Sequence, residues 1–415
     1  MSGLRIALMI DDFFPSSGGI GRSVQTQIEE LTALGHHVSL IAPDRHLQKP
    51  RLARVIECPT MYIEGLPAHL SILHCSARRA RLITDIAAFD VVHSQTERGA
   101  LILGARIARL QDIPHLHTFH ANIAGTHRAI KAAVLGTWSY QALVLPLLRR
   151  AAPLEIVPPT RLPSARHETG GFFARTDWRS FARIAQRVDA YAVPSPFMRG
   201  LIDEAAGQPL PSYVVPTGYN RDLLAAVGRA RRERVDGRVR FLSIGRLAKE
   251  KRLDVLVRAF RRADLPGAEL VIVGDGDQRD LLRRLAKGAD NIDFRGHLSS
   301  LDAIAYELVN ADALALASHR FDSQGLVIAE AVSAGLPVMY CDDRLTVGLS
   351  PDSALLTGPD VASMASGFRV LMDPARRRSM AEASTLLLPD LAPERTAEKY
   401  AQAYQDLISR REPRG

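Results

Sequence analysis

Residues 318–337 read Ser-His-Arg-Phe-Asp-Ser-Gln-Gly-Leu-Val-Ile-Ala-Glu-Ala-Val-Ser-Ala-Gly-Leu-Pro. Two carboxylates in this stretch, Asp322 and Glu330, have seven residues between them and flank Gly325. The apolar run after Gly325 ends at a Gly-Leu-Pro sequence, where a helix would stop. A helix that begins near Gly325 has unpaired N–H groups and a positive dipole end at its start, so it favours a bound anion there. Asp322 then lies in the preceding loop, and Glu330 lies about one and a half turns into the helix.

A second informative stretch, residues 241–260, reads Phe-Leu-Ser-Ile-Gly-Arg-Leu-Ala-Lys-Glu-Lys-Arg-Leu-Asp-Val-Leu-Val-Arg-Ala-Phe. An apolar run and a glycine precede a basic loop, and apolar residues then recur at the i, i+3, i+4, i+7 spacing of one helix face. Arg246 and Lys251 are therefore expected at the carboxyl end of a strand, where open α/β sheets bind their ligands. Lys249 and Arg252, in the same loop, are interpreted as solvated.

The first of these stretches resembles the Glu-x7-Glu motif of glycosyltransferase family 4, a family of retaining enzymes with the GT-B fold. The resemblance implies that Asp322 holds hydroxyls of the donor sugar and that Glu330 binds the ribose. It also implies that the helix start binds the diphosphate, through Gly325, Leu326 and Val327. Asp322 replaces the Glu that is usual in the family, and Gln324 replaces a usual Phe. Because its carboxylate is shorter, Asp322 leaves the identity of the donor sugar open.

The second stretch resembles the family's Gly-Arg…Glu-Lys motif, which starts here at Gly245. In the family the Arg and Lys neutralise the leaving diphosphate, and these roles fall on Arg246 and Lys251. Cleavage of a glycosyl–phosphate bond develops charge on the phosphate oxygens, which fixed cations stabilise without a metal ion. We therefore expect a metal-independent enzyme with no metal site and no cofactor, whose substrate is a nucleotide-diphosphate sugar.

Two further segments extend the donor site that the resemblance implies. Residues 270–276 read as a strand closed by a Gly-Asp-Gly turn that lies near the nucleotide in the family, so Gly274 is assigned to the site. Residues 294–298 resemble the segment whose main chain pairs with the base. His297 and Leu298 are therefore candidates through their backbone rather than their side chains.

The first half of the chain carries a glycine-rich loop and a candidate histidine. The loop at residues 11–21 lacks the spaced glycine fingerprint of dinucleotide-binding dehydrogenases. It resembles the family's Gly-Gly loop, in which Gly18 and Gly19 would face the diphosphate and the acceptor. His120 ends a His-Thr-Phe-His sequence and matches the family's histidine near the reacting centre of the donor sugar. The other histidines of this strand are interpreted as structural.

The whole chain predicts an α/β fold with two domains. Its 415 residues are too many for one compact core, and strand-like and helix-like runs alternate through both halves. The strands are expected at residues 5–10, 37–42, 91–93, 115–119, 191–193, 239–244, 269–273, 292–295, 313–316 and 338–340. The resemblance implies a GT-B fold in which two Rossmann-like, doubly wound parallel sheets face a cleft. The expected parts are an acceptor domain (1–215), a donor domain (216–389) and a C-terminal helical segment that crosses back (390–415).

Composition adds a cellular context. The chain is 47% hydrophobic and 24% charged, which is typical of globular proteins. Its three cysteines are too few and too scattered for a disulfide framework or a zinc site. Met1 leads directly into a strand without a signal sequence, so we expect a cytoplasmic protein.

Residues 122–187 concentrate the positive charge, with ten Lys or Arg residues against three acids. Within them, residues 132–148 are uncharged, which is close to the lower limit for a membrane span, but Gln141 and Pro146 argue against one. Two interpretations stay open: the segment lies on an anionic membrane surface, or it is a helix hairpin that covers the acceptor side of the first sheet. Nucleic acid is not expected as a partner, because there is no stacking pattern or recognised motif.

The resemblance implies a hexosyltransferase that acts with retention on a donor of the UDP-glucose or GDP-mannose type. The acceptor would be a hydroxyl of a membrane lipid, such as diacylglycerol, or of a cell-envelope glycan precursor, with the enzyme peripheral on the inner membrane face. One alternative is a sugar-nucleotide epimerase or hydrolase, which needs an acid and a base that we do not find. Another is a non-enzymatic binding module, which the combination of Arg246, Lys251, His120 and Glu330 disfavours.

Overall fold

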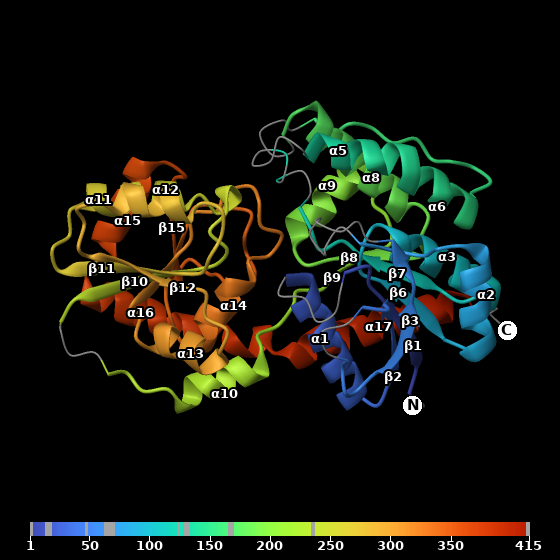
Figure 1. The fold of residues 1–415 in the computed structure, drawn as a ribbon, viewed down its shortest axis with the longest axis horizontal. Helices are drawn as coiled ribbons and strands as arrows, with labels where there is room; N and C mark the ends of the chain where they lie inside the picture. The colour runs from blue at the N-terminus through green and yellow to red at the C-terminus, as the bar shows by residue number, and fades with distance from the viewer. Residues whose placement is uncertain are drawn as a thin grey trace. The chain divides into compact units, whose positions relative to one another are not determined.

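The computed structural model describes residues 3–12, 19–45, 49–61, 71–122, 125, 127, 133–164, 170–233 and 237–411. The chain forms two compact units. In Figure 1 the first is blue to green together with the red C-terminal helix, and the second is yellow-green to orange-red. The first unit comprises Met1–Thr217 and Glu394–Gly415, and the second comprises Gly218–Pro393. The boundaries expected from the sequence, after residues 215 and 389, fall two and four residues before these divisions.

Each unit contains one parallel sheet with the strand order of a doubly wound fold. The first sheet has the order β3-β2-β1-β6-β7-β8-β9, and the second has the order β12-β11-β10-β13-β14-β15. Successive strands are added first toward one edge of the sheet and then toward the other. The change of direction, here called the reversal, lies between β1 and β6 in the first sheet and between β10 and β13 in the second. Ligands of such sheets bind beyond the carboxyl ends of the strands at this reversal. The predicted α/β class, with two doubly wound parallel sheets, is confirmed.

The predicted strands agree with the observed ones to within one residue at each end, but the edge strands β3 and β9 of the first sheet and β15 of the second were not predicted. The first sheet contains β1 (Arg5–Met9), β2 (His37–Pro43), β3 (Arg54–Cys58), β6 (Val91–Ser94), β7 (His115–Thr118), β8 (Ala190–Val193) and β9 (Ser212–Val214). The second contains β10 (Val239–Ile244), β11 (Ala268–Val273), β12 (Ile292–Gly296), β13 (Ala313–Ala315), β14 (Val338–Tyr340) and β15 (Ala354–Leu356). The first unit also contains a short antiparallel pair, β4 (Thr60–Met61) and β5 (Ile72–Leu73), which is separate from the parallel sheet.

Helices cover both faces of the first sheet (Figure 1). Side chains alternate across the buried strands, so Leu8 packs with α1 (Gly19–Ala33) and α17 (Pro393–Arg411), while Met9 packs with α2 (Ala77–Ile86) and α3 (Gly99–Gln111). The predicted C-terminal helix is therefore α17, and it buries Tyr400 and Tyr404 in the first unit. Tyr191 of β8 faces a core shared with α8 (Phe172–Ala185) and α9 (Pro196–Ala206).

The basic segment also contributes helices to the first unit. They are α5 (Ala133–Ser139), the π-helix η2 (Tyr140–Val144) and α6 (Leu145–Ala151), followed by α8. Tyr140, Leu148 and Phe181 lie in the core, and Phe181 stacks on Phe119 with ring centroids 4.5 Å apart. These helices therefore cover the sheet, as one of the two interpretations expected. Several positions of the segment lie outside the described residues. No helix in the described part of the chain is both long and apolar enough to cross a membrane.

The second sheet is covered in the same way. On one face Phe241 meets Phe260 and Phe368 edge to face, within a core formed with α11 (Leu253–Ala263), α12 (Arg279–Ala286) and α15 (Val361–Val370). On the other, Leu242 packs with α10 (Arg221–Arg229), α13 (Leu301–Val309) and α14 (Leu326–Ser333). The remaining elements are the 3-10 turns η3 (Lys249–Lys251) and η4 (Leu388–Leu391) and helix α16 (Pro374–Thr385).

Candidate functional site

The main chains at the carboxyl ends of β10 and β11 pack directly against each other. Gly274 has a φ of +137°, and a Cβ at this position would lie 1.9 Å from the carbonyl oxygen of Gly245. The N–H of Gly245 donates to the carbonyl of Val273 over 3.0 Å. Only glycine permits this approach. The structure therefore places Gly245 and Gly274, two of the predicted donor-site residues, side by side next to the reversal of the second sheet.

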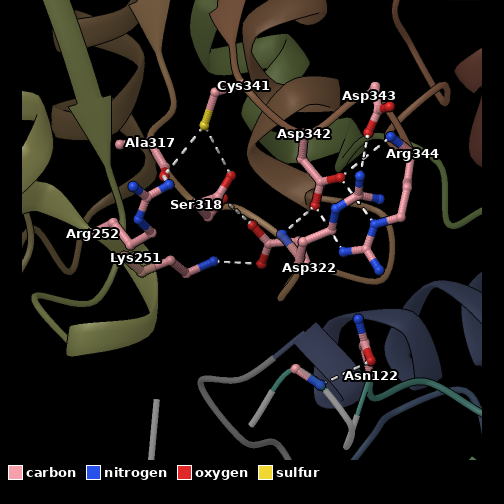
Figure 2. A network of polar contacts seen from close by, with 12 residues as sticks. Asn122, Lys251, Arg252, Ala317, Ser318, Asp322, Cys341, Asp342, Asp343 and Arg344 are labelled. Carbon is pink, nitrogen blue, oxygen red and sulfur yellow. Dashed lines mark hydrogen bonds and ion pairs between the residues drawn. The ribbon is translucent and has the colours of Figure 1, made fainter. Parts of the chain in front are cut away.

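The central polar contact of the second unit joins Lys251 and Asp322. Lys251 lies in η3, after β10, and Asp322 lies in the loop after β13, so each follows one of the two strands at the reversal. The Lys251 Nζ is 2.6 Å from the Asp322 Oδ1, and the hydroxyl of Ser318 donates to the other carboxylate oxygen (Figure 2). The two side chains are 28% and 13% exposed, so the pair is shielded from solvent yet open to a ligand.

An ion-pair network that we did not predict holds the same loop. The guanidinium of Arg344 donates to both oxygens of Asp342, over 2.9 and 2.8 Å, and the N–H of Arg320 donates to Asp342 over 2.6 Å (Figure 2). Burial opposes ionisation of Asp342, but Arg344 and these N–H groups outweigh it and lower the pKa of the carboxyl. The charged residues shortly after β14, such as Asp342 and Arg344, were the sequence signal that could have revealed this network.

Helix α14 begins where the first motif predicted a helix. Gly325 is its N-cap, with a left-handed φ of +79°, and its carbonyl accepts from the N–H of Ile328 over 2.9 Å. The N–H groups of Leu326 and Val327 have no hydrogen-bond partner among the described residues. Glu330 follows in the next turn and is 6% exposed. The helix start is thus an open donor surface that favours an anion.

The other predicted residues of the second unit are not linked to the Lys251–Asp322 pair by a hydrogen bond or ion pair among the described residues. Arg246 is 63% exposed and pairs with Glu250. His297 and Leu298 follow the edge strand β12, and within the described residues they make no polar contact with Lys251 or Asp322. Arg252, which we expected to be solvated, instead donates to the carbonyls of Ala317 and Pro359 and so ties the basic loop to neighbouring segments.

In the first unit, His120 follows β7 and joins a buried chain of polar groups. Its Nε2 is 2.6 Å from the amide oxygen of Gln95, which can only accept, so the proton lies on Nε2. The amide nitrogen of Gln95 donates to Gln27 over 2.8 Å. Burial lowers the pKa of His120, which keeps its imidazole neutral at pH 7. Gly19 begins α1, whereas Gly18 lies outside the described residues.

The reversal of the first sheet carries buried acids that sequence reasoning missed. Asp11, after β1, accepts from the N–H of Leu73 (2.7 Å) and the hydroxyl of Thr96 (2.6 Å), so it has a structural role. Glu97, after β6, has one carboxylate oxygen without a hydrogen-bond partner among the described residues. Burial raises the pKa of Glu97 to about 7. The acidic and polar residues that follow both strands were the signal that could have identified them.

Comparisons with known proteins agree with this geometry. Residues 17–223 match the model "Glycosyltransferase Family 4", and residues 228–347 match "Glycosyl transferases group 1". An alpha-monoglucosyldiacylglycerol synthase of Streptococcus pneumoniae is 23% identical, over 81% of this chain and 70% of that protein. A GDP-mannose-dependent alpha-mannosyltransferase of Mycolicibacterium smegmatis is 25% identical, over 82% and 80%.

Among solved structures, a sucrose-phosphate synthase of Thermosynechococcus elongatus superimposes with a TM-score of 0.71 at 19% identity, over 98% of this chain and 100% of that one. At this identity the likeness concerns the fold alone, and it agrees with the two doubly wound sheets described above. The two family models cover the two halves of the chain in turn. The chain therefore belongs to glycosyltransferase family 4, and it is a glycosyltransferase with the GT-B fold.

Proposed function

We propose that the protein transfers a hexose, with retention, from a nucleotide-diphosphate sugar to a hydroxyl of a membrane lipid. The observation that carries this proposal is the Lys251–Asp322 pair at the reversal of the second sheet, in which Lys251 follows β10 and Asp322 lies in the loop that leads into α14. A cation for the leaving group, a carboxylate for sugar hydroxyls and a helix start for phosphate oxygens are thus supplied by neighbouring segments of one unit.

In the proposed reaction the donor separates the resting ion pair. The diphosphate binds Lys251 and accepts from the N–H groups of Leu326 and Val327, while the sugar hydroxyls donate to Asp322. The bond between the sugar C1 and the phosphate oxygen breaks, and its electron pair stays on the diphosphate, which Arg246 and Lys251 stabilise. The acceptor oxygen bonds to C1 on the same face, and its proton passes to the departing phosphate. No metal ion takes part in this scheme.

The remaining residues bind and orient the donor. Glu330 accepts from the ribose hydroxyls, and the main chain at His297 and Leu298 pairs with the base. His120 presents the unprotonated Nδ1 of a neutral imidazole, because its Nε2 donates to Gln95. A neutral ring can accept from a sugar hydroxyl and adds no positive charge that would compete for the diphosphate.

A lipid acceptor is supported by the names of the relatives and by the surface of the first unit. The pneumococcal relative is named as a synthase of alpha-monoglucosyldiacylglycerol, which is a lipid that carries a sugar. The helices of the basic segment expose large apolar side chains, including Leu135 at 72%, Trp138 at 63% and Phe172 at 62%. Leu135 and Trp138 are three residues apart on α5 and share one face of it. Apolar residues beside basic ones suit the surface of an anionic membrane.

The decisive test incubates the purified protein with UDP- and GDP-sugars, each with and without diacylglycerol in vesicles, and measures release of the nucleoside diphosphate. We expect fast release only with the lipid, and an α-linked product by NMR. Equal release without an acceptor would favour a hydrolase, and an altered sugar nucleotide would favour an epimerase. Binding of the sugar nucleotide without turnover under any condition would favour a non-enzymatic module.

A further inference from the structure

A cavity lies in the first unit between the ends of α6 and α8. It has a volume of 270 Å³, close to the lower limit for small-molecule sites, and its walls include Val157, Pro158 and Thr160. Three arginines also line it, namely Arg149, Arg183 and Arg187, and it is called the arginine cavity below.

The position of this arginine cavity separates it from the reversal of the first sheet. Arg187 also lines a neighbouring cavity of 540 Å³, which reaches His115 and Asp189. These two residues stand at the amino ends of β7 and β8. His120 and Glu97, by contrast, follow the carboxyl ends of their strands. The arginine cavity is therefore at the opposite edge of the first sheet from His120 and Glu97.

Among the residues that the structure describes, no acidic side chain lines the arginine cavity. Within the described residues, Arg149 makes no hydrogen bond or ion pair. In the described part of the chain, Arg183 donates to neutral oxygens alone, those of Thr160 over 3.2 Å and Gln141 over 3.3 Å. Of the acids that line the neighbouring cavity, Asp112 and Asp189 are paired with Arg411, over 3.2 and 2.8 Å. Glu155, the third, makes no hydrogen bond or ion pair with Arg149, Arg183 or Arg187 among the described residues.

Arg187 is the buried member of the group. It is 8% exposed and donates to the carbonyl of Arg183 over 3.0 Å, while its Nε has no partner among the described residues. Burial lowers the pKa of Arg187, and so does the charge of Arg149. A buried cation without a counter-ion is costly, and an anion in the cavity would satisfy its N–H groups and screen the repulsion.

We propose that the arginine cavity is a binding site for a phosphate group, either of a soluble phosphorylated molecule or of a phospholipid headgroup. Several planar guanidinium groups around one space suit a tetrahedral oxyanion, which can accept from more than one of them at once. The Val157 and Pro158 walls would contact the rest of the molecule that carries the phosphate. This site goes beyond the proposed transfer reaction and does not depend on it.

The first experiment titrates inorganic phosphate into the full-length protein by calorimetry, with a nucleoside diphosphate present at saturation so that the donor site is occupied. We expect Arg149→Gln and Arg183→Gln each to weaken phosphate binding about tenfold or more, because each removes charge-assisted hydrogen bonds. Arg150→Gln is the matched control. Arg150 is the exposed neighbour of Arg149 on α6, carries the same charge and does not line the cavity. Arg149 is also exposed, so its variant should fold normally.

A second experiment distinguishes the two sources of phosphate by flotation with phosphatidylcholine vesicles that contain phosphatidylglycerol. If the headgroup is the ligand, Arg149→Gln and Arg183→Gln lower flotation more than Arg150→Gln, and added inorganic phosphate competes. If the ligand is soluble, phosphate binding is lost in the two variants while their flotation equals that of the control. The proposal is overturned if the wild type and both cavity variants behave alike in titration and in flotation. Loss of phosphate binding with normal transferase activity would leave the proposed function standing.

Discussion

The two sheets share one winding pattern but differ in how far the polar groups at their reversals are exposed to solvent. In the second unit, charged groups lie partly open to solvent, as in the Lys251–Asp322 pair and Arg246. In the first unit, the groups are more deeply buried: burial lowers the pKa of His93 and His117 and raises that of Glu97. The charged pair at this reversal, Arg98–Asp12, has side chains that are only 21% and 8% exposed. The comparison indicates that the second unit presents accessible charge to a ligand, whereas the first unit holds its titratable groups away from water.

The largest expected effect comes from removing the cations of the second unit. Arg246→Ala or Lys251→Ala should each cost about 2–4 kcal/mol of transition-state stabilisation, or roughly thirty- to a thousandfold in kcat/KM, by analogy with loss of one preorganised donor. Steady-state release of nucleoside diphosphate measures this. Lys249→Ala, an exposed cation of the same loop, is the control and should retain activity. Unchanged turnover in both variants would contradict the assignment, and loss of activity with a chelator would contradict a metal-independent reaction.

The buried acid of the first unit should make stability depend on pH. Glu97 has a native pKa of about 7 against a reference value of 4.5, so the native state binds its proton more tightly. Its contribution is complete below the reference pKa and is lost as the pH rises through 7. Wild type should lose on the order of 3 kcal/mol across this window relative to Glu97→Gln.

Fluorescence can follow this effect in the first unit alone, because both tryptophans of the chain, Trp138 and Trp178, lie there. Denaturant unfolding at pH 5 and pH 8 gives the difference between wild type and Glu97→Gln. Glu398→Gln, at an exposed position of α17, is the control. If the difference between wild type and Glu97→Gln is the same at both pH values, Glu97 is not held neutral by burial.

A smaller effect should separate the two acids of the first motif. Glu330→Gln should weaken binding of the free nucleoside diphosphate about tenfold, because a hydrogen bond to a charged group contributes about 1.5–3 kcal/mol. Asp322→Asn should leave this binding nearly unchanged and reduce sugar transfer, because the proposed partner of Asp322 is the sugar. Calorimetric titration of both variants decides between them. Equal losses of affinity in the two variants would show that the roles of Glu330 and Asp322 are assigned wrongly.

The smallest expected effect concerns the apolar surface of the first unit. The double variant Leu135→Ser with Trp138→Ser should reduce flotation with anionic vesicles roughly five- to tenfold, since it removes apolar area that would enter the membrane interface. Leu386→Ser, at an apolar position of the second unit that is 77% exposed, is the control. A wild type that never floats would make these helices a cover for the sheet only, and a soluble acceptor would then be the better hypothesis.

Much of the fold and part of the candidate site could be predicted because they depend on local patterns. The helix after Gly325 follows from its own apolar run and glycine. The edge strands β9 and β15 have only three residues each, and β3 mixes charged with apolar residues, so their patterns are too short or too mixed to be distinguished from loops.

The Lys251–Asp322 contact joins residues 71 positions apart and depends on β10 lying beside β13, which no local pattern shows. For the same reason the burial of Glu97 could not be predicted, because it results from the packing of segments distant in sequence.

The return of α17 to the first unit has a consequence for biosynthesis. The hydroxyl of Tyr404 is 2.7 Å from the imidazole of His93, and that of Tyr400 is 3.2 Å from the hydroxyl of Thr118. Both tyrosines leave the ribosome after the whole second unit. A nascent chain that stops before α17 would therefore expose the His93 side of the first sheet to water. The second unit has all its strands by then and can fold first, so maturation of the N-terminal part of the protein should wait for the last helix to be translated.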